Sequence, residues 1–190
     1  MSKQLKEIQQ TLKANASDEN IAFFSKIVPG QTRKLYGVKT PVLNGLVKKY
    51  KEFSFELAEE LWHSGAHEER IIAIKILENK GKTDPARLIH LLKQFANDID
   101  NWALCDGMGM QFLRSIVKTH SKEIFEIAAA YNKDENFWKR RLSLVMVEWY
   151  TRHDDKHLAI LKLVKSLEND EEYYVKKAVA WIKRNFEKEK

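Results

Sequence analysis

The chain has 190 residues and a formal net charge of +6, and its 44% hydrophobic and 11% aromatic content excludes a disordered protein. Seven glycines and three prolines are too few for the turns of an all-β fold, whereas long stretches rich in Lys, Glu, Leu and Ala predict helices. No apolar run approaches the ~18 residues of a membrane span, so we expect no membrane partner.

About ten helices are predicted, and several carry recognisable start signals. Ser17 is the expected N-cap of the second helix. Thr40 is the expected cap of the third, with Pro41 at the first helical position. Ser54 is expected to cap the fourth. The predicted helices cover residues 3–14, 18–28, 41–50, 54–62, 68–79, 85–96, 98–118 (as one helix or two that meet near 106), 122–131, 135–150, 155–167 and 171–186.

Four charged residues recur at near-equal separations of 36, 35 and 36 residues: Arg70, Asp106, Arg141 and Lys177. Each stands at or near the start of an apolar helical stretch. A period of this size is typical of stacked helix pairs. We therefore predict one domain over residues 1–190, an all-α HEAT-like helical-repeat superhelix (an α-α solenoid), with these four side chains along a basic concave groove.

Basic residues are concentrated in two stretches that contain no acid. Residues 31–50 hold Arg33, Lys34, Lys39, Lys48 and Lys49, and residues 107–122 hold Arg114, Lys118 and Lys122. Such segregation indicates a basic face for phosphate groups. Lysine-rich helix faces that are simply solvated explain the same pattern.

Residues with metal-binding or nucleophilic chemistry form no convincing set. His63 and His67 are four residues apart without an obvious third ligand, and the same is true of His153 and His157. Cys105 is interpreted as a small buried side chain, and a single cysteine fits a reducing compartment. The first ten residues lack the apolar core of a signal peptide, so we expect a cytoplasmic location.

The strongest candidate for chemistry is Asp106. Trp102 lies one helical turn before it, so a helix would place the indole and the carboxylate on one face. Trp181 stands one turn after Lys177 in the same way. The alternative is that Asp106 only caps a helix that starts at Gly107. Two further tryptophans are assigned to core packing: Trp62 and Trp149.

Several motifs together resemble the bacterial AlkD-type DNA alkylation repair proteins, which are HEAT-like-repeat alkylpurine DNA glycosylases. The motifs are YGVKTPVL at 36–43, the W-x-x-x-D of Trp102 and Asp106, FWKRR at 137–141 and EYYVKKAVAWIKRNF at 172–186. The resemblance covers residues 15–186. It implies that Asp106 is catalytic, that Trp102 and Trp181 border the lesion nucleotide, and that Arg141, or Arg140, contacts DNA. Other residues expected to bind the lesion or DNA are Trp138, Lys177, Lys39 and Arg70.

The implied function is that of a monofunctional glycosylase, a hydrolase that cleaves the N-glycosidic bond of cationic N3- or N7-alkylated purines in duplex DNA. Such a purine is a good leaving group, so the catalytic demand falls on the sugar, where Asp106 would stabilise positive charge and position water. No metal or organic cofactor is implied, and we expect a monomer. Two alternatives stay open: a non-catalytic HEAT-like module that binds distorted or branched DNA, and a protein-interaction solenoid.

Overall fold

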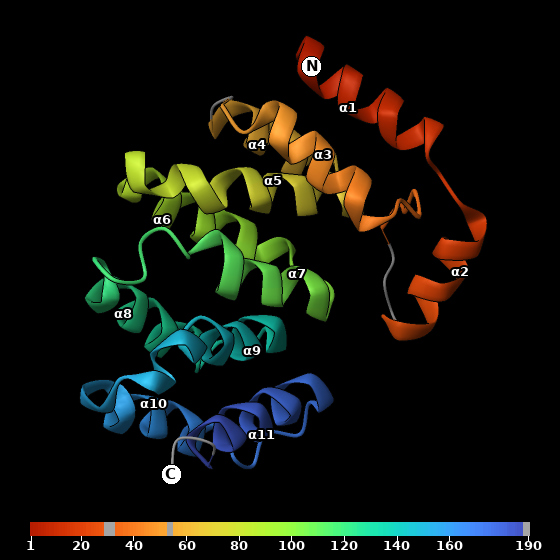
Figure 1. Cartoon of the computed structure of the whole chain (residues 1–190). Helices are drawn as coiled ribbons and strands as arrows, with labels where there is room; N and C mark the ends of the chain where they lie inside the picture. The colour runs from red at the N-terminus through yellow and green to blue at the C-terminus, as the bar shows by residue number, and fades with distance from the viewer. Residues whose placement is uncertain (29–32, 53–54, 188–190) are drawn as a thin grey trace. The chain divides into compact units, whose positions relative to one another are not determined.

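The computed structural model describes residues 1–28, 33–52 and 55–187, and within these ranges the secondary structure is helical without a strand (Figure 1). The predicted all-α class is therefore confirmed. The chain divides into two compact units, Met1–His90 and Leu91–Lys190, which we describe separately. The single repeat domain over residues 1–190, with its basic concave groove, stays a prediction.

Unit 1 contains five complete helices and the beginning of a sixth. They are α1 (Lys3–Ala14), α2 (Asp18–Ile27), α3 (Thr40–Tyr50), α4 (Phe55–His63), α5 (His67–Lys80), a 3-10 turn at Gly81–Thr83 and α6 (Pro85–Phe95), which contains the unit boundary. Helix α5 packs against α3 and α4, and its residues are buried on almost every side.

The predicted helix starts in unit 1 are only partly correct. Ser17 caps α2, as predicted, because its hydroxyl accepts the N–H of Asn20 at 3.3 Å. The prediction for α3 is wrong by one residue, since Lys39 occupies the cap position and Thr40 and Pro41 already belong to the helix. Ser54 lies outside the described residues.

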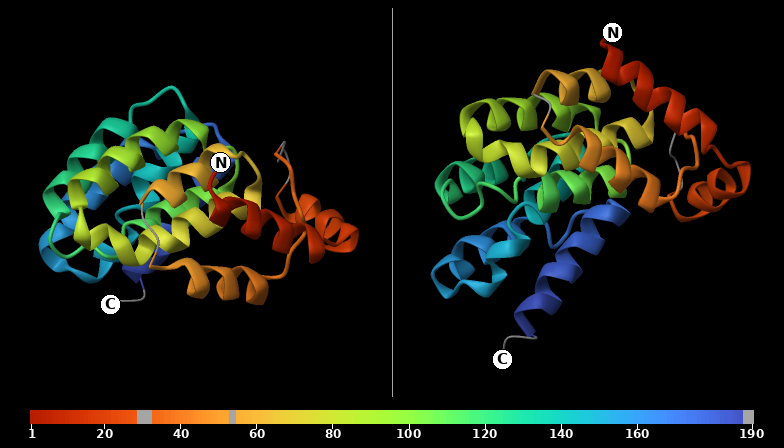
Figure 2. Two further views of the ribbon diagram at one scale, coloured as in Figure 1. Left: turned by 90° about the horizontal axis from the view of Figure 1, so that it is seen from above. Right: turned by 45° about the horizontal axis from the view of Figure 1, so that its top comes forward.

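Unit 2 is organised around α9, which packs against α7, α8, α10 and α11. The last two of these neighbours are drawn in blue in Figures 1 and 2. After the end of α6, the elements of unit 2 are a 3-10 turn η2 (Ala96–Asp98), α7 (Trp102–Asp106), a π-helix η3 (Gly107–Phe112), α8 (Ser121–Tyr131), α9 (Phe137–Val145), a 3-10 helix η4 (Glu148–Arg152), α10 (Asp154–Ser166) and α11 (Tyr173–Glu187).

Two predicted helices of unit 2 are shorter than expected. The helix expected from residue 98 begins at Trp102, because the Asn101 side chain caps it by accepting the Leu104 N–H at 3.0 Å. It changes to a π-helix at Gly107 and ends at Phe112. The helix expected over 135–150 is divided into α9 and η4.

A glycine sets how closely η3 approaches α9. A Cβ atom added to Gly109 would lie 2.6 Å from Cγ1 of Val145 and 2.9 Å from the backbone nitrogen of Met146. Any larger residue would therefore push the two helices apart. Since Asp106 directly precedes η3 and Arg141 lies on α9, this close approach also determines how far apart those two side chains lie.

Of the helices within residues 1–28, 33–52 and 55–187, none combines the length and the apolar character required to cross a membrane.

Candidate functional site

Asp106 and Arg141 form an ion pair at the interface of α7 and α9 in unit 2. Arg141 Nε donates to Asp106 Oδ1 at 3.0 Å, and Nη2 donates to Oδ1 at 2.8 Å and to Oδ2 at 2.9 Å. The Arg141 side chain is 7% exposed and that of Asp106 is 25% exposed. The arginine therefore holds the carboxylate from the protein side, while part of the carboxylate faces solvent.

Arg141, which lies on α9, joins this helix to α7 and α11. Besides Asp106 on α7, it binds α11, because its Nη1 donates to the backbone carbonyl of Tyr174 at 2.7 Å. The Tyr174 ring packs on Trp138 of α9 with a centroid separation of 5.0 Å. The Cys105 thiol donates to the Trp138 carbonyl, with 3.7 Å between sulfur and oxygen. These contacts fix the guanidinium, so the orientation of the Asp106 carboxylate is fixed too.

Burial and charge act in opposite directions on the acid. Burial raises the pKa of the Asp106 carboxyl, and the charge and hydrogen bonds of Arg141 counteract that rise. The carboxylate can accept about four hydrogen bonds, and Arg141 donates three of them. Room remains for one further donor, such as a water molecule, from the exposed side.

Two alternatives from the sequence can be decided at this position. In the described part of the chain, the Asp106 side chain makes no capping bond to the backbone of the following helix, so it is not simply a cap. Cys105 is buried, as predicted, and burial raises the pKa of its thiol well above the usual value. A neutral thiol of this kind is a poor nucleophile.

The tryptophans implicated by sequence have different environments. Trp102 is half-buried one helical turn before Asp106, and Trp181 is half-buried on α11. Trp138 is only 8% exposed and packs between the rings of Phe137 and Tyr174. Trp138 therefore supports the pair from the interior and does not present its ring to a ligand.

The two tryptophans assigned to the core differ in burial. Trp62 is fully buried, as predicted. The assignment of Trp149 is wrong, because this residue is half-buried and its ring stacks on His153 with a centroid separation of 4.4 Å.

The structure distinguishes Arg140 from Arg141. Arg140 Nε donates to Asp170 Oδ2 at 2.6 Å, and its Nη1 donates to the backbone carbonyls of Asp134 and Glu135 at 2.9 Å each. Arg140 thus closes the loop before α9 onto the loop before α11. Of these two arginines, Arg141 is the one that pairs with Asp106. The two partners are 35 positions apart, which is one interval of the period noted in the sequence.

The other predicted cations differ in exposure. Lys177 is exposed on α11, with Nζ 5.3 Å from the centroid of the Tyr173 ring, and Lys39 is exposed in unit 1. Arg70 is only 4% exposed: its Nε donates to the Trp62 carbonyl at 3.1 Å, and its guanidinium lies 4.5 Å from the centroid of the Trp62 ring. The prediction that Arg70 lines a DNA-binding surface is therefore corrected. It packs in the interior because α5 is buried on almost every side.

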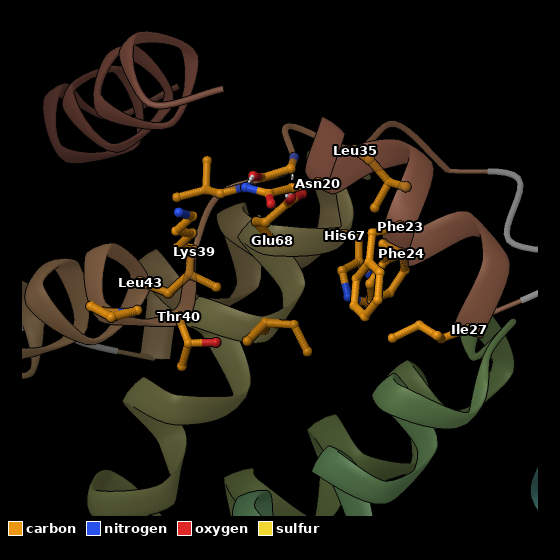
Figure 3. Close-up of a pocket in the computed structure, with 14 residues that line it drawn as sticks. Asn20, Phe23, Phe24, Ile27, Leu35, Lys39, Thr40, Leu43, His67 and Glu68 are labelled. Atoms are coloured by element: carbon orange, nitrogen blue, oxygen red, sulfur yellow. Dashed lines mark hydrogen bonds between the residues drawn. The ribbon is translucent and has the colours of Figure 1, made fainter. Parts of the chain in front are cut away.

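Unit 1 contains a cavity of about 540 Å³ that the sequence did not reveal (Figure 3). Lys39, Thr40 and Leu43 line one side, and Phe23, Phe24 and His67 lie across from them. The sequence signal for it would have been the apolar face of α2, where Phe23 and Ile27 are exposed.

Burial, together with Arg70 and Arg33, lowers the pKa of His67 to about 4, so its imidazole is neutral near pH 7. Within the described ranges, no three His, Cys, Asp or Glu side chains are grouped so that they could hold a metal ion. The pairs His63–His67 and His153–His157 therefore lack a third ligand there.

Comparison with known proteins decides the family. The model of the DNA alkylation repair enzyme family matches residues 8–190. The chain belongs to this family. The resemblance inferred from the motifs is thereby confirmed, and the family supports a role in the repair of alkylated DNA, with DNA as the substrate.

A solved structure, described as a predicted DNA alkylation repair enzyme from Enterococcus faecalis, has the same fold. It superposes with a TM-score of 0.76 at 20% identity, over 92% of this chain and 84% of that one. No curated protein matches the chain. At this identity the likeness concerns the fold alone, so the chemistry has to be argued from the Asp106–Arg141 pair.

Proposed function

We propose that this member of the family is a monofunctional DNA glycosylase that releases cationic N3- or N7-alkylated purines from duplex DNA. The observation that carries the proposal is the Asp106 carboxylate, which Arg141 holds on one side and which stays partly open on the other. A fixed anion at an accessible position suits a reaction whose transition state develops positive charge.

The reaction makes modest demands on acid catalysis. Alkylation at N3 or N7 gives the purine a positive charge, so it leaves as a neutral base and takes the electron pair of the C1′–N bond. The sugar then gains oxocarbenium character, which a nearby carboxylate stabilises. Water adds to C1′ and loses a proton, and Asp106 has one acceptor position left to orient that water.

Arg141 acts in this scheme through Asp106. Its guanidinium is buried and engaged with Asp106 and with the Tyr174 carbonyl, so it orients the carboxylate and favours its ionised form. The resemblance implies that Arg141 contacts DNA, and we propose that it also positions Asp106. Trp102 and Trp181 are the half-buried indoles with which a cationic base would interact, since aromatic faces attract cations.

Sequence-independent affinity would come from exposed cations. Lys177 and Lys39 are both exposed and can reach backbone phosphates. The scheme requires no metal and no organic cofactor, so base release should continue in the presence of a chelator.

The test is base release from a duplex with a single N7-methylguanine, quantified by chromatography of the free base. A matched duplex with a single uracil is the control, because uracil carries no positive charge in the nucleotide and would have to leave as an anion. We expect release from the first duplex and none from the second. Binding to the N7-methylguanine duplex without any release would overturn the glycosylase proposal and favour a non-catalytic DNA-binding module.

A further inference from the structure

A second cationic surface lies in unit 2, formed by the segment 113–120 after η3 and by η4 with the start of α10. Two open clefts, of about 320 and 450 Å³, share the side chain of Trp149. Arg114 and Arg152 line the first cleft, and Lys118 and Lys156 line the second. We call these five residues the Trp149 surface.

The two segments that form this surface are tied together. The Tyr150 hydroxyl donates to the backbone carbonyl of Val117, and the Tyr150 ring packs on Phe125 with a centroid separation of 5.2 Å. The cations thus project from elements that are fixed relative to each other within the unit.

The charge balance of the surface is positive. The two clefts are lined by four cations and two carboxylates. One of the carboxylates, Glu148, is buried and accepts from Arg152 Nη2 at 3.3 Å and from Asn185 Nδ2 at 2.9 Å. The other, Asp155, pairs with the adjacent Lys156 at 2.9 Å. Lys118 is exposed and, within the described residues, has neither an ion-pair partner nor a hydrogen-bond partner.

Trp149 adds an aromatic group between the cations. It is half-buried, one ring face stacks on His153, and its indole N–H has no acceptor among the described residues. Cations attract the phosphodiester backbone of a duplex, and a side-chain N–H between them can donate to a phosphate oxygen.

We propose that the Trp149 surface is a second DNA contact that binds the phosphodiester backbone away from the Asp106–Arg141 pair. Asp106 precedes η3 and Arg141 lies within α9, whereas the Trp149 surface is built from residues that follow the ends of both helices. The inference rests on the proposed function in so far as the chain binds DNA. It adds a place where the flanking duplex is held.

The test compares two double variants that remove equal charge. Lys118→Ala/Lys156→Ala alters the Trp149 surface, and Lys133→Ala/Lys162→Ala removes two exposed lysines elsewhere in unit 2. Affinity for an unmodified duplex is measured between about 50 and 200 mM salt. We expect the slope of log K against log salt to become less steep by about 1.8 in the first variant, as for two lost phosphate contacts. We expect the control to keep the wild-type slope.

Equal slopes for the two double variants would overturn the proposal. The proposal would also be overturned if Lys118→Ala/Lys156→Ala lost affinity only for an acidic probe such as polyglutamate, because the surface would then bind a protein partner. Base release at saturating protein keeps the two proposals separate. The Trp149-surface variant should release base at the wild-type rate, since Asp106 is untouched. A less steep salt dependence in Lys118→Ala/Lys156→Ala, with no base release by the wild type or the variants, would refute the glycosylase proposal and still support the second DNA contact.

Discussion

Each unit of the molecule contains carboxylates that are largely or partly withdrawn from solvent, but they are satisfied in different ways. In unit 1, Glu68 is 4% exposed and accepts the backbone N–H groups of Tyr36, Gly37 and Val38 at 3.1, 2.7 and 3.3 Å. Its neighbour Glu69 is 1% exposed and accepts the Tyr36 hydroxyl at 2.7 Å and the Ser64 hydroxyl. In unit 2, Asp106 is one-quarter exposed and has Arg141 as its ion-pair partner.

The difference teaches how to distinguish a structural acid from a candidate catalytic acid. Glu68 already accepts hydrogen bonds from the backbone of the segment before α3, so a ligand would have to displace these backbone donors. Asp106 is held from one side only and keeps capacity toward solvent. We therefore expect Glu68 and Glu69 to contribute to stability, and Asp106 is the proposed catalytic acid.

Removing Glu68 should have the largest effect on folding. In Glu68→Ala, three backbone N–H groups lose their acceptor in a buried place, and we expect the free energy of unfolding to fall by about 3–5 kcal/mol. Urea unfolding followed by circular dichroism measures it. The matched control, Glu19→Ala, removes an exposed acid from the first turn of α2 and should cost about 0.5 kcal/mol. A loss below 1 kcal/mol in Glu68→Ala would contradict a structural role.

Enlarging Gly109 should disturb the site in unit 2. In Gly109→Ala, the new Cβ would meet Val145 and Met146, so we expect the free energy of unfolding to fall by about 2–3 kcal/mol. Base release should also slow, because η3 directly follows Asp106 and α9 carries Arg141, so pushing the two elements apart moves the pair apart. The control is Gly45→Ala, where a Cβ has nothing within 4 Å on helix α3. That change should stabilise the protein by about 0.5–1 kcal/mol. Equal stability of both variants would exclude a close contact at Gly109.

A smaller effect concerns the pH dependence of unit 1. The pKa of buried His67 is lowered to about 4, below the ~6.5 of an unfolded histidine. The unfolded chain therefore binds the proton more tightly, so this stabilisation is present above pH ~6.5 and is lost as the pH falls toward 4. We expect His67 to contribute a loss of about 2 kcal/mol between pH 7 and pH 5.

Denaturant unfolding of the wild type and of His67→Gln at both pH values isolates this contribution, because the carboxylates titrate in both proteins. The variant should lose less stability on acidification than the wild type does. Parallel losses would show that His67 is not buried in the neutral form.

The sequence drew attention to both members of the Asp106–Arg141 pair but not to how they interact. The W-x-x-x-D spacing and the 35-residue period identified Asp106 and Arg141, because helical repeats reuse one position per repeat. The period also suggested Arg70 as an equivalent cation. Burial of α5 on almost every side makes Arg70 part of the interior, and a charge pattern along one chain does not reveal that.

Other features depend on tertiary packing and could not be read from periodicity. The π-helix after Asp106 is formed by a Met- and Gly-rich stretch whose apolar residues also fit an ordinary helix. Trp149 was assigned to the core because core packing is the default interpretation of a single tryptophan. The packing of η4 leaves it half-buried beside two clefts. The cavity in unit 1 is lined by α2, the start of α3 and α5, and α5 is distant from α2 in sequence.

The most direct test of the central claim is the single-turnover rate of base release at saturating protein, for Asp106→Asn, Arg141→Lys and the double variant. We predict that Asp106→Asn lowers the rate by about 10²–10³-fold, as for the loss of a preorganised electrostatic group. The double variant should be no slower than Asp106→Asn, because Arg141 acts through Asp106. A rate within about twofold of wild type for Asp106→Asn would contradict the catalytic role of Asp106, and multiplicative losses in the double variant would contradict the positioning role of Arg141.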